Sequence, residues 1–467
     1  MRTGVVRIQD IVAEGRRLTG GFHVSEDQRA IGSLRRLKGS MSPLKDLVKG
    51  RGIFRGPIFS RMYVDDPSHG DPYVSARDIV TSDVRAAAYL SRRHGRLLDD
   101  LRLHEGMILV TCSGMNLGSA IWTRGEMDGL VASHDLIRIE PNAGAVPPGF
   151  LFAFLSSRYG HALIRKQIYG GHIKHIEPEH IADLLVPRMG ADLEREVHRL
   201  TESTNKNRDR AHELRRNAQA AFSKHFPLSD LSRAPTSVRH AVFSVQASSL
   251  GRLDATHHSP ACRAAAAELA KGSDVRRLDE VARVFTPGIF KRMHVEDPKF
   301  GYPYFSGTEL FQYDPEPRGY LSRRAHKIED YLVSLNWLLI QDAGQLEGLI
   351  GRLVRVTPSV ANSVVSNHLM RVATDDAEDA AYLSVVLSSP HGYRAITRNA
   401  FGSSIPQLDP AHIGALRLPW PSSAVRKRVA EPILEAWKLE DEASESARRA
   451  LSKVEDAIEK GANSWPR

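Results

Sequence analysis

Residues 53–75 read IFRGPIFSRMYVDDPSHGDPYVS, and residues 284–306 repeat the pattern as VFTPGIFKRMHVEDPKFGYPYFS. At a constant offset of 231 (284 − 53), Phe54 matches Phe285, Arg61 matches Arg292 and Tyr73 matches Tyr304. The segment YLSRR recurs at the same offset, at residues 89–93 and 320–324. Because so many collinear matches do not arise by chance, these stretches belong to two copies of one unit.

Further matched segments extend the repeat to the end of each copy. SHDLIRI at 133–139 matches SNHLMRV at 366–372, and LSSRYG at 155–160 matches LSSPHG at 387–392. The closing block YGGHIKHIEPEHIADLLVP begins at Tyr169, and its counterpart FGSSIPQLDPAHIGALRLP begins at Phe401. The period is far longer than the roughly 20–50 residues of solenoid repeats. The sequence therefore predicts a tandem domain duplication.

A helical pattern follows each copy. Seam residues, mostly apolar with some polar members, recur at alternating spacings of four and three, which is typical of a coiled coil. In the first pattern they are Leu193, Val197, Leu200, Thr204, Asn207, Ala211, Leu214 and Ala218. In the second they are Val425, Val429, Pro432, Ala436, Leu439, Ala443, Ser446 and Ala450. We expect Pro432 to kink or delay the second helix, and the two helices to pair antiparallel about a pseudo-twofold axis.

Each copy has the pattern of an α/β (α+β) fold. Helices are expected over 26–37, 149–167, 260–271 and 379–398, and strands over 107–111, 135–139, 337–340 and 369–372. The predicted order is a globular domain, a helix, a linker, a second globular domain and a C-terminal helix, at residues 1–190, 191–226, 227–239, 240–421 and 422–467.

Composition limits the class of protein. The 467 residues contain 64 Lys and Arg against 55 Asp and Glu, a net charge of +9 that permits a polyanionic partner. No stretch approaches the roughly 18 apolar residues of a membrane helix, and we expect no secretory signal. Cys112 and Cys262 are the only cysteines. That count excludes a disulfide framework and a cysteine-rich zinc site, and it fits a reducing cytoplasm.

Two similar globular units, each followed by a long helix, resemble the specificity subunit of type I restriction–modification systems over nearly the whole chain. The closing blocks carry the most specific likeness, through Gly170, Gly171, Ile173, Pro178, Leu184 and Pro187 and through Gly402, Ser403, Ser404, Ile405, Pro410, Leu416 and Pro419. RLDATHHSP at 252–260 looks like the family's lead into its second recognition domain. The first copy departs there, because RRLTGGFHV at 16–24 lacks the aspartate.

The resemblance implies a non-catalytic subunit that binds double-stranded DNA. Each unit would be a target recognition domain for one half of a bipartite site. The helices would set the spacing and dock methyltransferase subunits, two of them, and a restriction and translocase subunit would join. S-adenosylmethionine, ATP and Mg²⁺ are expected in those partners and no cofactor in this chain, and the location is expected to be cytoplasmic and nucleoid-associated. A helix over 191–226 would span about 54 Å, against roughly 34–36 Å for one turn of DNA.

Base recognition requires hydrogen-bonding side chains in the groove, and phosphate binding requires cations and backbone N–H groups. The closing turns offer Gln167, Gly171, His172, Lys174 and His175 in the first copy and Arg398, Ser403, Ser404 and Gln407 in the second. The alternative for the glycines of these turns, Gly170 and Gly402, is a helix C-cap.

The matched loops offer a second set of DNA-binding candidates: Arg61, Tyr63, Arg92, Arg93, Lys291, Arg292, His294, Arg323 and Arg324. The alternative for Arg61 and Arg292 is a structural ion pair with Asp66 or Asp297. Retention of Arg-Met and Asp-Pro in both copies favours structure, because different targets require different contacts. The pair Tyr63 and His294 is then the more informative one. The paired arginines suit phosphate binding and a fold ion pair equally.

Signatures of catalysis are lacking. The sequence has no G-x-G-x-x-G, no G-x-x-x-x-G-K-[ST] and no polar-Pro-Pro-aromatic segment for a flipped base. We interpret Glu296 to Lys299 as a turn, and His257-His258 lack the further ligands of a metal site. Two alternatives stay open: a nuclease or methyltransferase with duplicated DNA-binding domains, and a specificity-subunit-like adaptor in a related phage-defence system.

Overall fold

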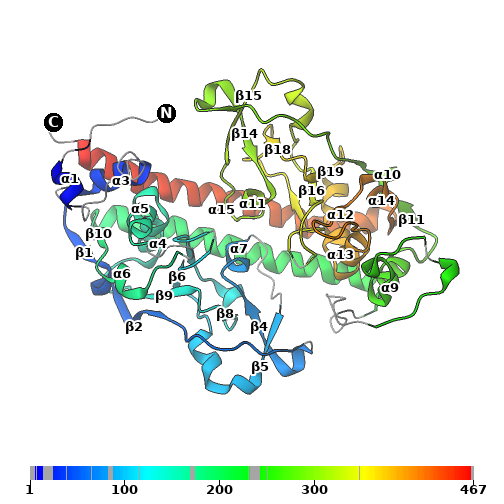
Figure 1. Cartoon of the computed structure of the whole chain (residues 1–467), viewed down its shortest axis with the longest axis horizontal. Coiled ribbons are helices and arrows are strands. Elements are labelled where there is room, and N and C mark those ends of the chain that lie inside the picture. The colour runs from blue at the N-terminus through cyan, green and yellow to red at the C-terminus, as the bar shows by residue number, and fades with distance from the viewer. Residues whose placement is uncertain are drawn as a thin grey trace. The chain divides into compact units, whose positions relative to one another are not determined.

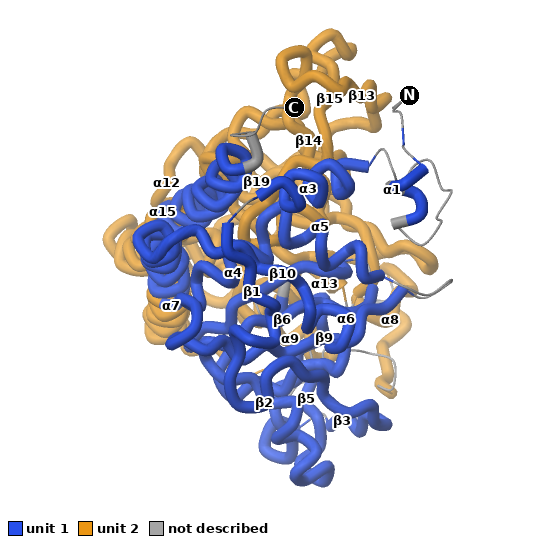
Figure 2. The backbone as a smooth tube through the Cα atoms, turned by 90° about the vertical axis from the view of Figure 1, so that its left-hand side faces the viewer, with its two compact units in different colours: residues 1–80, 84–209, 442–467 blue, residues 81–83, 210–441 orange. Residues whose placement is uncertain are grey.

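The computed structural model (Figure 1) describes residues 6, 8–13, 25–37, 39–64, 66–81, 88–114, 116–168, 174–229, 231, 242–249, 251–346 and 348–463. The chain divides into two compact units (Figure 2): unit 1 holds residues 1–80, 84–209 and 442–467, and unit 2 holds residues 81–83 and 210–441. Each unit thus includes part of both long helices. The predicted domain boundaries at 190, 226, 239 and 421 stay predictions.

The described strands of unit 1 form three sheets. The small sheet pairs β1 (Met41–Pro43) with β10 (Leu185–Pro187). An antiparallel four-stranded sheet has the order β2 (Val48–Arg55), β9 (Leu136–Pro141), β6 (Ile108–Thr111), β7 (Ala120–Trp122). The other four-stranded sheet has the order β3 (Tyr63–Val64), β5 (Ala88–Ser91), β4 (Gly70–Val74), β8 (Val131–Ala132), and its β4–β8 pair is parallel.

The described strands of unit 2 repeat this topology. The small sheet pairs β11 (Val275–Arg277) with β20 (Arg417–Pro419). The antiparallel sheet has the order β12 (Arg283–Phe285), β19 (Leu369–Ala373), β16 (Leu338–Gln341), β17 (Leu353–Arg355). The mixed sheet has the order β13 (His294–Val295), β15 (Gly319–Ser322), β14 (Gly301–Phe305), β18 (Val364–Val365), and β14–β18 is its parallel pair. The predicted duplication and the α/β class are confirmed.

The helices of the two units also correspond. The matched pairs are α3 (Glu26–Arg35) with α9 (Pro260–Leu269), α4 (Pro148–Ser156) with α12 (Ala377–Ser388), α5 (Arg158–Lys166) with α13 (Pro390–Thr397), and α6 (Pro178–Ala182) with α14 (Pro410–Gly414). Short helices are α1 (Ile8–Ala13), α8 (Ala255–His258), α10 (Leu278–Val281) and α11 (Gly307–Leu310). The prediction of one continuous helix over 149–167 and over 379–398 was wrong, because each is two helices.

The break falls at the second serine of each L-S-S segment. Ser157 Oγ accepts a hydrogen bond from Gly160 N (3.2 Å), and Ser389 Oγ accepts one from the Gly392 N–H (2.9 Å). Each serine is therefore the N-cap of a new helix. A Cβ atom on Gly160 would lie 2.1 Å from the Phe154 carbonyl oxygen, and one on Gly392 would lie 2.1 Å from that of Val386. The repeated S-x-x-G pattern is thus required by this sharp turn.

The two long helices are α7 (Ala191–His225) and α15 (Ser423–Asn463). In unit 1, Lys453 Nζ lies 2.9 Å from Glu196 Oε1, and Thr204 Oγ1 donates to the Ala443 carbonyl at 3.3 Å. In unit 2, Arg215 makes a two-point ion pair with Glu440, at 2.8 Å for each bond. Because the partner number falls as the α7 number rises, the helices pair antiparallel, as predicted. Pro432 lies inside α15, so the expected delay of that helix was wrong, while the alternative of a kink stays a prediction.

The seams of both helices are part of the unit cores. The buried seam positions are Val197, Thr204, Ala211, Leu214 and Ala218 on α7 and Val429, Ala436, Ala443 and Ala450 on α15. In unit 1, Val197, Ala450 and Val454 pack into the core formed by β6, β9, α4 and α5. In unit 2, Phe222, Ile433 and Trp437 pack into the core around α12. In the described part of the chain, no helix has both the length and the apolar character needed to cross a membrane.

A wholly buried arginine joins the two larger sheets of each unit. Arg138 on β9 donates to the carbonyl oxygens of Ala132 on β8, Leu136 and Leu101, each at 3.0 Å. Arg371 on β19 donates in the same way to Val365 on β18 (3.1 Å), Ser366 (3.0 Å), Leu369 (2.5 Å) and Tyr331 (3.4 Å). Burial lowers the pKa of both guanidinium groups to about 10. The identical residue in both repeats thus serves the frame of the fold.

Candidate nucleic-acid interface

An arginine over a tyrosine ring recurs at the same place in each unit. Arg61 precedes β3, and its guanidinium carbon lies 5.6 Å from the centre of the Tyr73 ring on β4. Arg292 lies 5.4 Å from the Tyr304 ring on β14. We call each pair, with the residue that begins the neighbouring strand, an Arg–Tyr cluster. That third residue is Tyr63 in unit 1 and His294 in unit 2, and both are exposed.

The third residue makes the same edge-on ring contact in both clusters. The rings of Tyr63 and Tyr73 lie 6.0 Å apart with an interplanar angle of 66°, and those of His294 and Tyr304 lie 6.3 Å apart at 81°. The frame around this position is therefore the same, while its hydrogen-bonding side chain differs. A phenol and an imidazole make different hydrogen bonds, so this pair has the properties expected of positions that distinguish two sequences.

Asp135 holds Arg61 in unit 1. Its carboxylate lies 3.8 Å from the Arg61 guanidinium, and Arg61 also lies 3.2 Å from His134 Nδ1. Burial raises the pKa of the Asp135 carboxyl, but hydrogen bonds from the Ser113 and Ser133 hydroxyls more than offset that effect and leave the pKa lowered. Asp66, the partner suggested by the sequence, accepts a hydrogen bond from Ser68 N at 2.8 Å and caps a turn.

The paired arginines differ in their contacts. Arg92 donates to Asp71 (3.0 Å) and to the Ser68 carbonyl (2.8 Å), so it has a fold contact. Arg323 lies 4.4 Å from the centre of the Tyr302 ring. Arg93 and Arg324 are exposed at the same turns. The second arginine of each pair is therefore better placed for a phosphate than the first.

The closing turns are partly described. In unit 1, Gly170, Gly171 and His172 lie outside the described residues, Gln167 is the C-cap of α5, Lys174 is exposed, and His175 pairs with Ser113 through the backbone. In unit 2, Ser403, Ser404 and Gln407 are exposed, in a turn closed by the Phe401–Gln407 backbone pair. Gly402 has φ of +98° inside this turn, whereas α13 ends earlier with Arg398 as its C-cap. The helix C-cap interpretation is therefore wrong for Gly402.

The remaining candidates lie on exposed and half-buried surface. Lys291 and Arg292 are exposed. Arg398 is half-buried, with Nε 2.9 Å from the His257 carbonyl oxygen, and burial lowers its pKa. The turn Glu296 to Lys299 is closed by Asp297, which accepts a hydrogen bond from Lys299 N at 3.0 Å, as its counterpart Asp66 accepts one from Ser68 N. In the part of the chain that the structure describes, no group of three His, Cys, Asp or Glu side chains is gathered as for a metal ion.

A buried carboxyl under the closing turn of unit 2 was missed by sequence reasoning. Asp342 follows β16 and is only 6% exposed, while Cys112 occupies the matched place after β6. The Leu408 N–H donates to the Asp342 carbonyl (2.7 Å), as Ile176 N–H does to Cys112 (3.1 Å). Burial raises the pKa of Asp342 to about 6, although His368 Nδ1 lies 3.4 Å away. The available signal was an acidic residue where the other repeat has a small apolar one.

Because the Asp342 carboxyl is buried, we expect its ionisation to lower the stability of the fold in a pH-dependent way. The folded pKa of about 6 exceeds the ordinary value of 3.8, so the folded state binds a proton between those values. Stability therefore falls as pH rises from 4 to 6, and above that the penalty is complete, about 3 kcal/mol at most. We expect Asp342→Asn to raise the unfolding temperature at pH 8 and to have little effect below pH 4, as measured by thermal unfolding.

Asp135→Asn is the matched control with the opposite sign. The pKa of Asp135 is lowered, so its stabilisation is present above pH 4 and is lost as pH falls. This substitution should lower the unfolding temperature at pH 8. An Asp342→Asn protein that is less stable than the unmodified chain at pH 8 would contradict the assignment of a costly buried charge.

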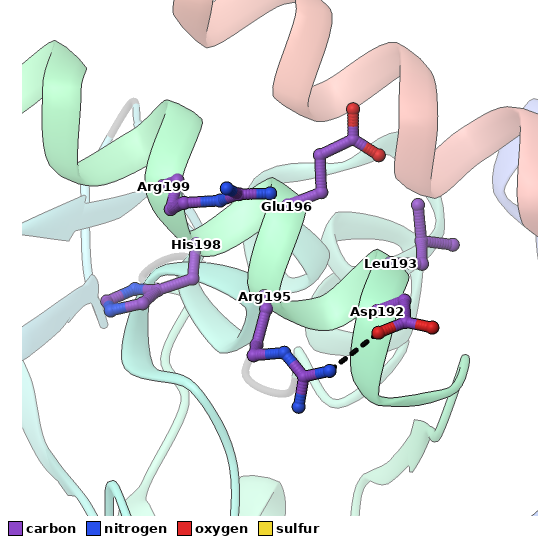
Figure 3. Close-up of a pocket in the computed structure, with 6 residues that line it drawn as sticks. All are labelled: Asp192, Leu193, Arg195, Glu196, His198 and Arg199. Atoms are coloured by element: carbon purple, nitrogen blue, oxygen red, sulfur yellow. Dashed lines mark hydrogen bonds and ion pairs between the residues drawn. The ribbon is translucent and has the colours of Figure 1, made fainter.

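A cavity of about 520 Å³ lies beside the start of α7 in unit 1 (Figure 3). Its lining residues are Asp192, Leu193, Arg195, Glu196, His198 and Arg199. Asp192 accepts from Arg195 at 2.6 Å, and His198 Nδ1 accepts from Gly149 N at 3.1 Å. Figure 3 shows these side chains pointing in different directions. They do not converge on one point, as the groups of a catalytic centre must.

Comparisons with known proteins give matches among solved structures. A type I restriction–modification S subunit from M. genitalium matches at 12% identity and a TM-score of 0.35, over 92% of this chain and 97% of that one. The HsdS subunit from Thermoanaerobacter tengcongensis matches at 14% identity and a TM-score of 0.27, over 90% and 96%.

A third structure concerns complex assembly and conformational transition of the type I restriction–modification system. It matches at 15% identity and a TM-score of 0.26, over 91% of this chain and 97% of that one. No protein-family model and no curated protein matches the chain. Because these TM-scores are below 0.5, we base the functional proposal on the residues of this chain.

Proposed function

We propose that this chain is the non-catalytic specificity subunit of a type I restriction–modification complex. Each unit binds one half of a bipartite target in double-stranded DNA, and the whole chain directs methyltransferase and restriction subunits to that target. The observation that carries the proposal is the duplication itself: both units have the same strand order in every described sheet. A frame used twice in one chain is suited to binding two sites on one repetitive partner.

Differences at matched surface positions support sequence recognition. Tyr63 faces solvent where unit 2 has His294. Asp135 stands where unit 2 has His368, and in the closing turns His175 stands where unit 2 has Gln407. Hydrogen-bonding side chains of different type on one frame are what two different half-sites require. Identical exposed cations such as Arg93 and Arg324 fit phosphate contacts, which carry no sequence information.

The long helices support the choice of partners. Each contributes residues to the cores of both units. The antiparallel pair offers two related outer faces, which fits two copies of a methyltransferase subunit and one restriction and translocase subunit. In this proposal, S-adenosylmethionine, ATP and Mg²⁺ bind to those partners. The assembled complex acts in the cytoplasm, at the nucleoid.

Exchange of one unit tests the proposal. We expect replacement of residues 1–190 by the first recognition domain of another specificity subunit to change one half of the methylated motif only. The measurement is sequencing of methylated bases in DNA modified by the reconstituted complex. Exchange of residues 240–421 is the matched control and should change the other half only. A change of both halves in either exchange would show that the units do not act separately.

A further inference from the structure

Each unit presents the same apolar loop to solvent. The loop covers residues 56–62 between β2 and β3 in unit 1, and residues 287–293 between β12 and β13 in unit 2. We call these the two fingers. In unit 1, Ile58 is 74% exposed and Met62 is 48% exposed; in unit 2, Ile289 is 91% exposed and Met293 is 46% exposed.

Inward-facing residues hold each finger in place. Phe59 packs against the small core of unit 1 and makes an edge contact with His94 at 5.0 Å, while the Phe290 ring lies 4.0 Å from that of Tyr331. The arginine of the Arg–Tyr cluster is the second support. In the order Ile-Phe-x-Arg-Met, the phenylalanine packs inward and the exposed arginine contacts a tyrosine ring, while the isoleucine and the methionine face solvent.

The repeated Arg-Met favoured a structural role, and the ring contacts supply one for the arginine, but the exposed isoleucine and methionine require an explanation outside the fold. An exposed apolar side chain that packs on nothing is free to differ between copies, as exposed Leu185 and its counterpart Arg417 do. Ile58 and Met62 are instead repeated as Ile289 and Met293. Both fingers must therefore meet the same chemistry, whereas the two units as a whole meet different sequences under the proposed function.

Exposed cations lie beside each finger. The Ser91 N–H donates to the Met62 carbonyl (2.9 Å), and the Ser322 N–H donates to that of Met293 (2.8 Å). Arg93 and Arg324 are exposed and each follows the bonded serine by two residues, and Lys291 lies within the second finger. Apolar tips flanked by cations fit a duplex, in which stacked bases lie between two rows of phosphates.

We propose that each finger inserts its isoleucine and methionine against the base stack beside its half-site, as a contact that does not depend on sequence. The proposal rests on the proposed function and adds a shared wedge to it. Isoleucine and methionine are among the side chains that partly unstack base steps and kink a duplex. The fingers thus hold and bend DNA, while the differing positions distinguish its sequence.

A serine substitution at all four positions tests the wedge. The variant carries Ile58→Ser, Met62→Ser, Ile289→Ser and Met293→Ser, all in exposed positions that leave the core intact. The probe is a 20-base-pair duplex of random sequence, about 68 Å long, labelled at both ends for energy transfer. We expect about tenfold weaker binding and loss of the end-to-end shortening, with an unchanged dependence of affinity on salt. Leu185→Ser is the control and should bind as the unmodified chain does.

The possible outcomes distinguish the wedge proposal from the proposed function on which it rests. If the variant with all four serine substitutions binds and bends the duplex normally, the wedge proposal is overturned and the specificity role is left intact. Loss of methyltransferase binding with normal DNA binding would assign the fingers to a protein partner instead. Absence of salt-sensitive DNA binding by the unmodified chain would overturn both proposals.

Discussion

Insertion of seven residues into each long helix is expected to reduce affinity for the native target to the level of random DNA, a loss of about a thousandfold or more. The insertions belong between Asp209 and Arg210 in α7 and between Asp441 and Glu442 in α15, where the compact units divide. The contacts within each unit, such as Thr204 with Ala443 and Arg215 with Glu440, then stay in register. A heptad keeps the seam in phase and adds about 10 Å of helix.

The insertion should also change the target. Ten ångströms is about three base pairs, so we expect a methylated motif with the same two halves and a gap longer by about one to three base pairs. The same seven residues inserted into the predicted linker at 227–239 are the control and should leave the gap unchanged. If the protein with both insertions methylates a motif whose two halves keep the original gap, the idea that the helices set the spacing is rejected.

Removal of either buried arginine is expected to cost about 3 kcal/mol or more of unfolding free energy. Arg138→Met fills the same space but leaves the carbonyl groups of Leu101, Ala132 and Leu136 without their donor. Burial of the cation is itself costly, as its pKa of about 10 shows. The loss of hydrogen bonds to the carbonyl groups still outweighs the gain from removing the buried charge, because each unsatisfied buried carbonyl costs about 1–3 kcal/mol.

Urea unfolding of the full chain measures this effect, and Arg371→Met should destabilise unit 2 in the same way. Arg51→Met is the control, because Arg51 is exposed and its ion pair with Asp100 (2.6 Å) contributes less than about 1 kcal/mol. Arg138→Lys should fail to restore stability, since one ammonium group cannot reach carbonyls spread over two sheets. An Arg138→Met protein within 1 kcal/mol of the unmodified chain would show that the two sheets do not depend on this residue.

Much of the fold was predictable because the chain contains two copies of one unit, which can be compared with each other. Matched apolar runs identified strands such as β6 and β16, and the heptad positions identified α7 and α15. Arg138 and Arg371 were visible as a matched pair in SHDLIRI and SNHLMRV, but a lone arginine in a strand gives no sign that it is buried. Its burial depends on carbonyl groups from loops and from a second sheet, which local sequence does not specify.

The candidate site was predictable in part for a similar reason. Tyr63 and His294 were identified from their difference on a shared frame, and the structure gives them the same ring contact. The Asp135 partner of Arg61 lies far along the chain, so only tertiary structure brings the two together. Ser157 and Ser389 broke predicted helices because a serine inside an apolar run does not show whether its hydroxyl caps a helix.

Sequencing of methylated bases in the genome, with and without the gene for this chain, tests the central claim most directly. A bipartite DNA-recognition subunit predicts one motif with two defined halves and a fixed gap, whose methylation disappears on deletion and returns when the gene is restored. An unchanged set of methylated motifs after deletion would contradict the account. Methyl transfer to plain duplex DNA by the isolated chain would contradict it equally.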